Sequence, residues 1–156
     1  MRRKDREVTD RAKIREVLQD CHCCRIGLVD QGQAYIVPMN FGYRWEEELP
    51  VLYFHSAKEG RKINLIGENP RVGFEMDTGY EFHRGELACQ CSAAFRSVIG
   101  SGAITVVEDP QEKMEGFLAI MEHCSGSRAW RFDEKMLGSA CVLKLRVTEL
   151  SCKEHL

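Results

Sequence analysis

The chain has 156 residues, of which 44% are hydrophobic and 29% charged, and its formal net charge is −2. This length fits a single domain, 1–156, that can bury a core without disulfides or a structural metal. The slight acidic excess argues against a nucleic-acid binder, which carries a strong basic excess. No apolar run reaches the roughly 18–20 residues of a membrane helix. The charged N-terminal segment does not resemble a signal peptide, so we expect a cytoplasmic protein with cysteines present as thiols.

The first half of the chain predicts one helix followed by three strands. Thr9 or Asp10 can cap the helix. Strands are expected at 23–30, 34–43 and 51–55, with a tight turn at 31–33 and an acidic loop at 45–50. Pro38 cannot donate a ladder hydrogen bond, so it either interrupts the second strand or places it at a sheet edge.

The second half predicts two helices and three strands. The first helix spans 57–66, and the second begins at Asp109-Pro110 and ends at Ser125-Gly126. Strands are expected at 71–76, 95–108 and 141–150, and 78–91 is expected to be irregular or partly extended. Antiparallel strands with a few inserted helices indicate an α+β, mainly β protein built on a closed or nearly closed small barrel.

The segment from His55 to Lys62 is the main candidate site. A strand ends at His55, and Ser56 with Glu59 matches a helix capping box. The first turn of a helix offers free backbone N–H groups and the positive end of the dipole, which suit a phosphate, and Lys58 and Lys62 add positive charge. A capped, solvent-facing helix with ordinary surface lysines explains the same residues, and these residues alone do not decide between the two interpretations.

Cysteine and histidine side chains give weaker signals. Residues 21–24 contain a C-x-x-C spacing and 89–91 contain two further thiols, but the second spacing is unusual for a metal site. We therefore expect most of these cysteines to be small buried hydrophobes and predict no metal site. His55 is the histidine singled out, either as a hydrogen-bonding or proton-donating group next to the phosphate site or as a structural histidine.

Three stretches, read in order, resemble a known family. They are Tyr35 to Tyr43 (YIVPMNFGY), Leu52 to Lys62 (LYFHSAxxGxK) and Phe95 to Gly102 (FRSVIGxG). Together they resemble the pyridoxamine-5′-phosphate-oxidase-related, FMN-binding split-barrel proteins, and within them most closely the nitroimidazole-resistance (Nim-type) branch. The resemblance covers nearly the whole chain. Nim-type sequences often carry a tyrosine before the Arg-Ser pair, where this chain has Phe95.

The resemblance implies a six-stranded antiparallel split barrel with flanking helices, and a homodimer that binds FMN at the subunit interface. FAD or haem is a less expected cofactor. By resemblance, cofactor-binding residues fall in four groups: Val37, Pro38, Met39 and Asn40 along the flavin ring; His55, Ser56, Ala57 and Lys62 at the phosphate and ribityl end; Arg96, Ser97 and Val98 on a neighbouring strand; and Trp130 in a segment that can reach the partner's flavin. His55 is the expected catalytic residue.

No serine–histidine–acid or cysteine–histidine pattern is evident, so a bound cofactor should carry any chemistry. The leading hypothesis is an FMN-binding oxidoreductase that passes electrons to a small, electron-poor acceptor of nitroaromatic type. A flavin- or haem-binding carrier or sensor without turnover is the alternative, and a metal-binding module built on the cysteines is a third.

Overall fold

A computed structural model describes residues 3–156, apart from the Met136 side chain. Within this part of the chain, eight strands form one antiparallel sheet with the order β3-β2-β6-β7-β8-β5-β4, and β1 pairs with β8. The strands are β1 (Glu7–Val8), β2 (Cys24–Asp30), β3 (Gln33–Met39), β4 (Gly42–Glu46), β5 (Leu49–Ala57), β6 (Arg71–His83), β7 (Ser92–Val106) and β8 (Ala140–His155). Between described residues the strand path does not close. The expected mainly antiparallel α+β fold is confirmed, with eight strands instead of six.

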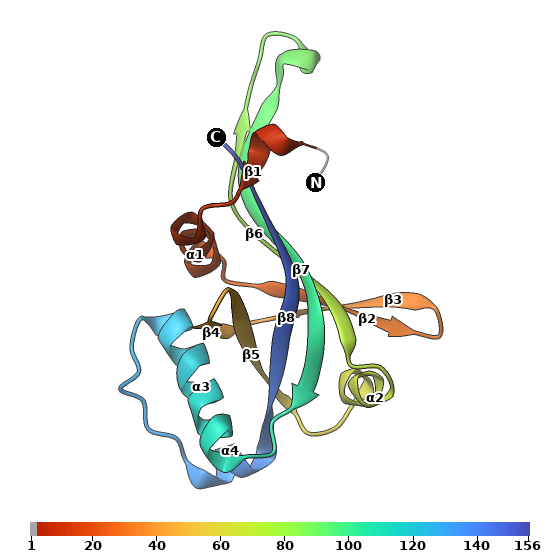
Figure 1. Ribbon diagram of the computed structural model, residues 1–156, viewed down its shortest axis with the longest axis vertical. Helices are drawn as coiled ribbons and strands as arrows, with labels where there is room; N and C mark the ends of the chain where they lie inside the picture. Colours follow the sequence, from red (N-terminus) through yellow and green to blue (C-terminus); the bar gives the residue numbers. More distant parts are fainter. Residues whose placement is uncertain (1–2) are drawn as a thin grey trace.

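Four α-helices flank the sheet in the described residues. They are α1 (Arg11–Asp20), α2 (Arg61–Glu68), α3 (Pro110–Ser125) and α4 (Glu134–Ser139). Short 3₁₀ turns lie at Lys4–Arg6 and Ala88–Gln90. Helix α3 lies along β4 and β5, and α2 lies near the other edge of the sheet (Figure 1). No helix of residues 3–156 combines the length and apolar character needed to cross a bilayer.

The two longer helices begin where the sequence predicts. Asp10 accepts a hydrogen bond from the backbone N–H of Ala12 at 2.8 Å, and Asp109 accepts one from Glu112 at 2.7 Å. Helix α3 ends at Gly126, which adopts the left-handed conformation (φ 73°) that glycine reaches without steric cost. These boundaries depend on capping residues close in the chain, which can be recognised from the sequence alone.

Strand β5 separates two apolar layers. Its Leu52 and Phe54 side chains point into the barrel core, whereas Val51 and Tyr53 pack against α3. Successive side chains of a strand point to opposite faces, so β5 contacts both layers. Each layer shields one face of the strand from water. Strand β5 is therefore buried on both sides up to Phe54.

Two glycines let α3 approach the sheet closely. A Cβ atom at Gly42 of β4 would lie 2.2 Å from the backbone of Ala119 in α3, and one at Gly116 of α3 would lie 2.6 Å from the Val142 side chain. Larger residues at these positions would push the helix away from the sheet. The position of α3, and of the segment that follows it, is thus set by close packing at these two glycines.

Several element boundaries differ from the sequence prediction. The expected strand 34–43 is divided into β3 and β4 by a break at Asn40 and Phe41. Strand β3 is the edge strand of the sheet, so Pro38 lies at a sheet edge, which is one of the two interpretations given above. The expected loop 45–50 was wrong, because β4 and β5 pair through a tight turn at 47–48. By contrast, the region 78–91 is partly extended, as predicted: β6 continues to His83, residues 84–91 form a loop with a short 3₁₀ turn, and β6 and β7 together make a long hairpin (Figure 1).

Candidate functional site

The end of β5 presents its side chains to two different places. Ser56 is buried and lies opposite Cys141 of β8, whereas His55 and Ala57 are exposed on the other face of the strand. This division follows from the two-residue period of a strand. The predicted segment therefore contributes to two neighbouring regions, one polar and one apolar.

The polar region joins a buried hydroxyl to a cluster of lysines. The Ser56 side chain is only 6% exposed, and its hydroxyl makes no hydrogen bond to any described residue. Lys62 is partly buried and forms no ion pair with described residues, and burial lowers the pKa of its ammonium group. The charges of Lys113, Lys62 and Lys58 all act to lower the pKa of the Cys141 thiol, although burial dominates and raises it. An anion bound here could accept hydrogen bonds from the Ser56 hydroxyl and the Lys62 ammonium group.

The predicted capping box at Ser56 and Glu59 was wrong. Helix α2 starts four residues later than predicted, at Arg61, and Gly60 occupies its N-cap with φ 122° and no side-chain cap. Glycine suits this backbone conformation because it has no Cβ. The free N–H groups of the first turn thus belong to Arg61 and its successors, and Ser56 is not used as a cap.

The two cations at the start of α2 have different environments. The Arg61 guanidinium donates to Asp30 at 2.7 Å and lies over the Tyr35 ring, 4.3 Å from its centroid. Lys62, the next residue, has no such partner within the described chain. The structure therefore leaves Lys62, and not Arg61, available for an anion.

The apolar region is a cavity of about 580 Å³ between the end of β5, helix α3 and the segment that follows it. Its lining comprises Asn40, His55, Phe117, Ile120, Met121, Cys124, Trp130, Arg131, Phe132, Asp133, Leu137 and Ala140. Three predicted site residues, Asn40, His55 and Trp130, thus meet in one cavity of one chain. An apolar enclosure with a few polar groups is typical of sites for small molecules.

The outer wall of the cavity is held by side-chain contacts. The Trp130 indole N–H donates to the Ser125 hydroxyl at 2.9 Å, and the Phe132 and Phe117 rings pack with their centroids 5.5 Å apart. The wall thus presents aromatic side chains to the interior of the cavity.

The structure separates the four residues predicted to contact the flavin ring, of which three lie in β3 and Asn40 follows the strand. Val37 and Met39 turn toward the barrel core, while Pro38 is exposed on the outer face opposite Arg25. Asn40, just past the end of the strand, is the member of this group that lines the cavity. These residues therefore offer contacts on two faces of the chain.

The residues predicted on β7 lie elsewhere. The Arg96 guanidinium donates to Glu16 at 3.2 Å and to Asp20 at 2.8 Å, so it fixes α1 onto the sheet. Val98 is fully buried in the core opposite Met76 and Cys152. Neither these two residues nor Ser97 lines the cavity at His55.

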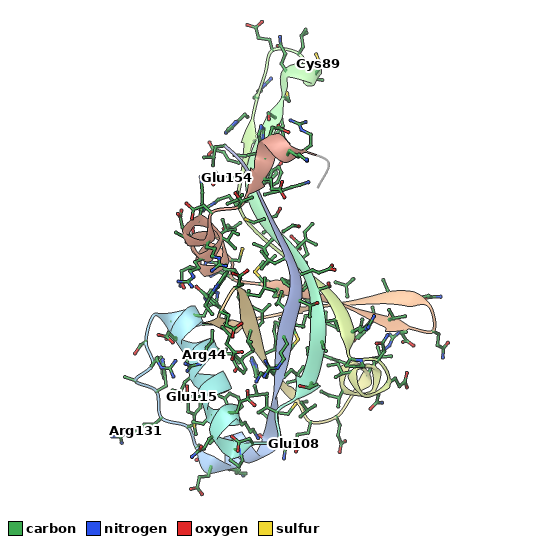
Figure 2. The ribbon with its side chains drawn as sticks, in the orientation of Figure 1. Arg44, Cys89, Glu108, Glu115, Arg131 and Glu154 are labelled. Atoms are coloured by element: carbon green, nitrogen blue, oxygen red, sulfur yellow. The ribbon has the colours of Figure 1, made fainter. Side chains whose placement is uncertain are left out.

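All eight cysteines are free thiols, and four of them are buried. Cys89 lies at the tip of the β6–β7 hairpin (Figure 2), away from the thiols at the start of β2. Within residues 3–156 no group of three or more side chains is arranged to hold a metal ion. His123, which has no assigned role from sequence, is buried between Phe41 and Tyr43 and lies 2.7 Å from the Cys21 carbonyl oxygen through its Nε2.

Comparison with known proteins identifies the family. The profile described as pyridoxamine 5′-phosphate oxidase matches residues 10–154. The chain belongs to this family. A comparison with functionally curated proteins gives no significant match.

Among solved structures, a candidate 5-nitroimidazole antibiotic resistance protein from Bacteroides thetaiotaomicron superposes with a TM-score of 0.81 at 27% identity, over 95% of this chain and 86% of that one. The flavocytochrome Anf3 from Azotobacter vinelandii gives 0.80 at 19% identity, over 100% and 72% of the two chains. An FAD- and haem-binding protein from Mycobacterium smegmatis gives 0.79 at 19% identity, over 96% and 73%. The split-barrel fold predicted from the sequence motifs is thereby confirmed.

Sequence reasoning missed most of the cavity. Phe117 and Met121 fall inside the helix predicted from Asp109 to Gly126 and were assigned no role at a site, and Phe132 and helix α4 were not predicted. The aromatic residues at 130 and 132 were the available signal, since both stand in a polar stretch after a helix end. That both side chains line the same cavity depends on tertiary packing.

The pKa of Lys62 predicts a change in stability with pH. The unfolded chain binds the Lys62 proton up to about pH 10.4, whereas burial lowers the folded pKa. Between these two values the unfolded state holds more protons, so stability rises with pH, and below both values the cost of burying the charge is fully present. Lys62→Met should therefore raise the free energy of unfolding at pH 7, and its advantage should shrink at pH 10.

Urea denaturation at the two pH values measures this effect. Lys58→Met, at an exposed neighbouring lysine, serves as the control and should change stability by no more than about 0.5 kcal/mol. A Lys62→Met protein that is less stable than the parent at pH 7 would show that the ammonium group is already paired.

Proposed function

We propose that this protein is an FMN-dependent oxidoreductase that reduces a small, flat, electron-poor acceptor of the nitroaromatic class. One observation carries the proposal: the Ser56 hydroxyl and the Lys62 ammonium group, which have no side-chain partner among the described residues, lie near an apolar cavity at His55 and Asn40. A phosphate-bearing aromatic cofactor has a charged end and a flat apolar end that match these two regions. The family of the chain and the flavin-binding solved neighbours support the same choice.

The residues present fit FMN at its charged end. The Ser56 hydroxyl and the Lys62 ammonium group would hold the phosphate, and the first-turn N–H groups of α2 point their dipole toward the same region. Lys58 adds long-range attraction without a close contact. Of the residues predicted from the sequence, we assign Ser56 and Lys62 to the phosphate end.

At the other end, Asn40 offers a side-chain amide that can both donate and accept hydrogen bonds. When bound, FMN supplies the electron transfer that protein side chains cannot perform. His55 lies in the cavity, where its imidazole can deliver a proton to the acceptor as it is reduced. A nicotinamide or another small donor supplies the electrons.

Haem or flavin carriage without turnover is the second candidate. It is favoured by two solved neighbours whose names include haem binding or a flavocytochrome, and by the exposed His55 imidazole, which can ligate iron. The visible spectrum separates the two, because haem gives a Soret band and flavin gives paired bands in the blue and near-ultraviolet. We further propose a cytoplasmic location, which fits eight unpaired thiols.

A homodimer is part of the proposal, and the outer face of β2, β3, β6 and β7 is its contact surface. Val29, Ile36 and Ile99 on this face are 53%, 56% and 51% exposed. Gly27 and Gly73 lie side by side in the ladder and leave a shallow apolar trough between these side chains. Exposed apolar side chains gathered on one face are typical of a contact surface, and Pro38 on the same face would bring β3 to the interface.

Flavin retention tests the proposed phosphate site. Lys62→Glu should weaken FMN binding at least ten- to hundredfold, because a charge-assisted contact contributes about 1.5–3 kcal/mol and the new carboxylate repels the phosphate. Arg61→Gln is the matched control, since Arg61 is already committed to Asp30 and Tyr35, and it should leave the affinity within about twofold. Quenching of FMN fluorescence gives the dissociation constants, and far-ultraviolet circular dichroism checks the fold. Equal affinity in the parent and Lys62→Glu proteins would reject the site.

The oligomeric state tests the dimer surface. Ile36→Lys places a charge on the apolar face and should convert the dimer to a monomer, as read by light scattering coupled to gel filtration. Asn64→Lys, on the exposed side of α2, adds the same charge elsewhere and should remain dimeric. If the parent protein is monomeric at micromolar concentration, or Ile36→Lys stays dimeric, this surface is not the interface.

A further inference from the structure

The outer wall of the apolar cavity is a segment without regular secondary structure, residues 127–133, between α3 and α4. Trp130 and Phe132 of this segment line the cavity together with Asn40 and His55. Trp130 is 48% exposed, so the wall is a single layer of side chains with solvent on its far side. Any outward shift of this layer would enlarge the cavity directly.

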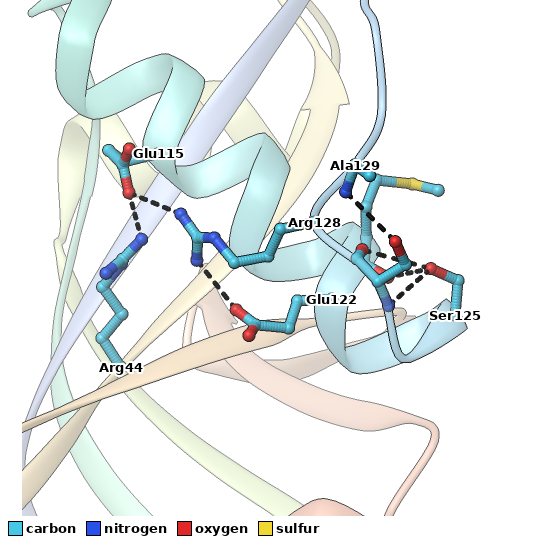
Figure 3. A network of polar contacts seen from close by, with 8 residues as sticks. Arg44, Glu115, Glu122, Ser125, Arg128 and Ala129 are labelled. Carbon is cyan, nitrogen blue, oxygen red and sulfur yellow. Dashed lines mark hydrogen bonds and ion pairs between the residues drawn. The ribbon is translucent and has the colours of Figure 1, made fainter.

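A charged network fastens this wall to α3. The Arg128 guanidinium lies between two carboxylates of the helix (Figure 3), and donates to Glu115 at 2.9 Å and to Glu122 at 2.8 Å. These carboxylates are about two helical turns apart. One planar guanidinium therefore clamps the segment along a considerable length of α3, which a flexible single ammonium group cannot do.

The network extends to the sheet. Arg44 of β4 donates to the same Glu115 carboxylate (Figure 3). Removal of Arg128 would leave Glu115 paired with Arg44, and would leave Glu122, whose side chain is 51% exposed, in contact with water. No buried charge would lose its only partner, so the fold should survive the loss of Arg128.

We propose that Arg128 is a positioning residue that holds Trp130 and Phe132 over the cavity and thereby limits the size of the aromatic acceptor that can enter. The identity of that acceptor rests on the proposed function, whereas the clamp rests on the network alone. Without the clamp, the segment retains the contact between Trp130 and Ser125 and the packing of Phe132 on Phe117, and it moves outward more often. Larger ring systems should then gain access.

Native-state proteolysis of the full chain tests the clamp. Chymotrypsin cleaves after aromatic residues, and cleavage at Trp130 or Phe132 requires the segment to leave the surface. Arg128→Gln should be cut about tenfold faster than the parent, as expected from the loss of two exposed ion pairs, and Arg128→Lys should fall between the two. Arg146→Gln, which removes an exposed ion pair with Glu46, is the control and should match the parent. Cleavage of Arg128→Gln at the parental rate overturns the proposal.

Acceptor size gives a readout that a purely structural role would not move. Nitrobenzene and 1-nitronaphthalene quench tryptophan fluorescence, so their dissociation constants can be measured with or without FMN. Arg128→Gln should shift the ratio of the two constants severalfold in favour of 1-nitronaphthalene, with Arg146→Gln unchanged. An unchanged ratio overturns the role in selectivity. Neither measurement needs bound FMN, so failure of FMN binding would count against the proposed function alone.

Discussion

Burial of β5 on both faces is the constraint on which the site depends. The strand pairs with β4 and β8, packs on the barrel core through one face, and meets α3 through the other. Beyond Phe54 the strand is no longer covered on both faces, but its alternate side chains still point in opposite directions. Ser56 therefore faces the polar region near α2, and His55 faces the cavity under α3, although the two residues are adjacent in sequence.

Close packing of α3 places the second half of the site. Gly42 and Gly116 bring the helix against the sheet, and the chain that leaves the helix at Gly126 returns along its outer side (Figure 1). This return brings Trp130 and Phe132 to the cavity, where the Arg128 network fixes them. The polar region depends on a strand end and a helix start, and the apolar region depends on a helix position. Their adjacency is a property of the fold and is not encoded in any single motif.

Local signals in the sequence predicted much of the fold. Asp10, Asp109 and Gly126 mark helix ends through contacts within a few residues, and the structure confirms them. The cap at Ser56 failed because β5 continues through Ser56 to Ala57 by pairing with β8, a long-range contact that overrides the capping pattern. The acidic stretch 45–50 became part of the β4–β5 hairpin, because Trp45 pairs with Pro50 and Glu46 with Leu49 across the turn at 47–48.

The candidate site was predictable only in part. The family resemblance indicated Asn40, His55 and Trp130, and the structure brings these three to one cavity. Arg96 was grouped with them by family resemblance, but in this chain it pairs with two acids of α1. The lack of a partner for Lys62 among the described residues, and the role of Arg128, depend on which charges are neighbours in the tertiary structure.

The central claim is that one ligand uses both regions, with its phosphate at Ser56 and Lys62 and its ring in or beside the cavity. The most direct test compares the affinities of FMN and riboflavin, which differ only in the phosphate group. A charge-assisted phosphate site of this kind should make FMN bind about ten- to a hundredfold more tightly than riboflavin. Equal affinities, or no binding of either compound, would contradict the account.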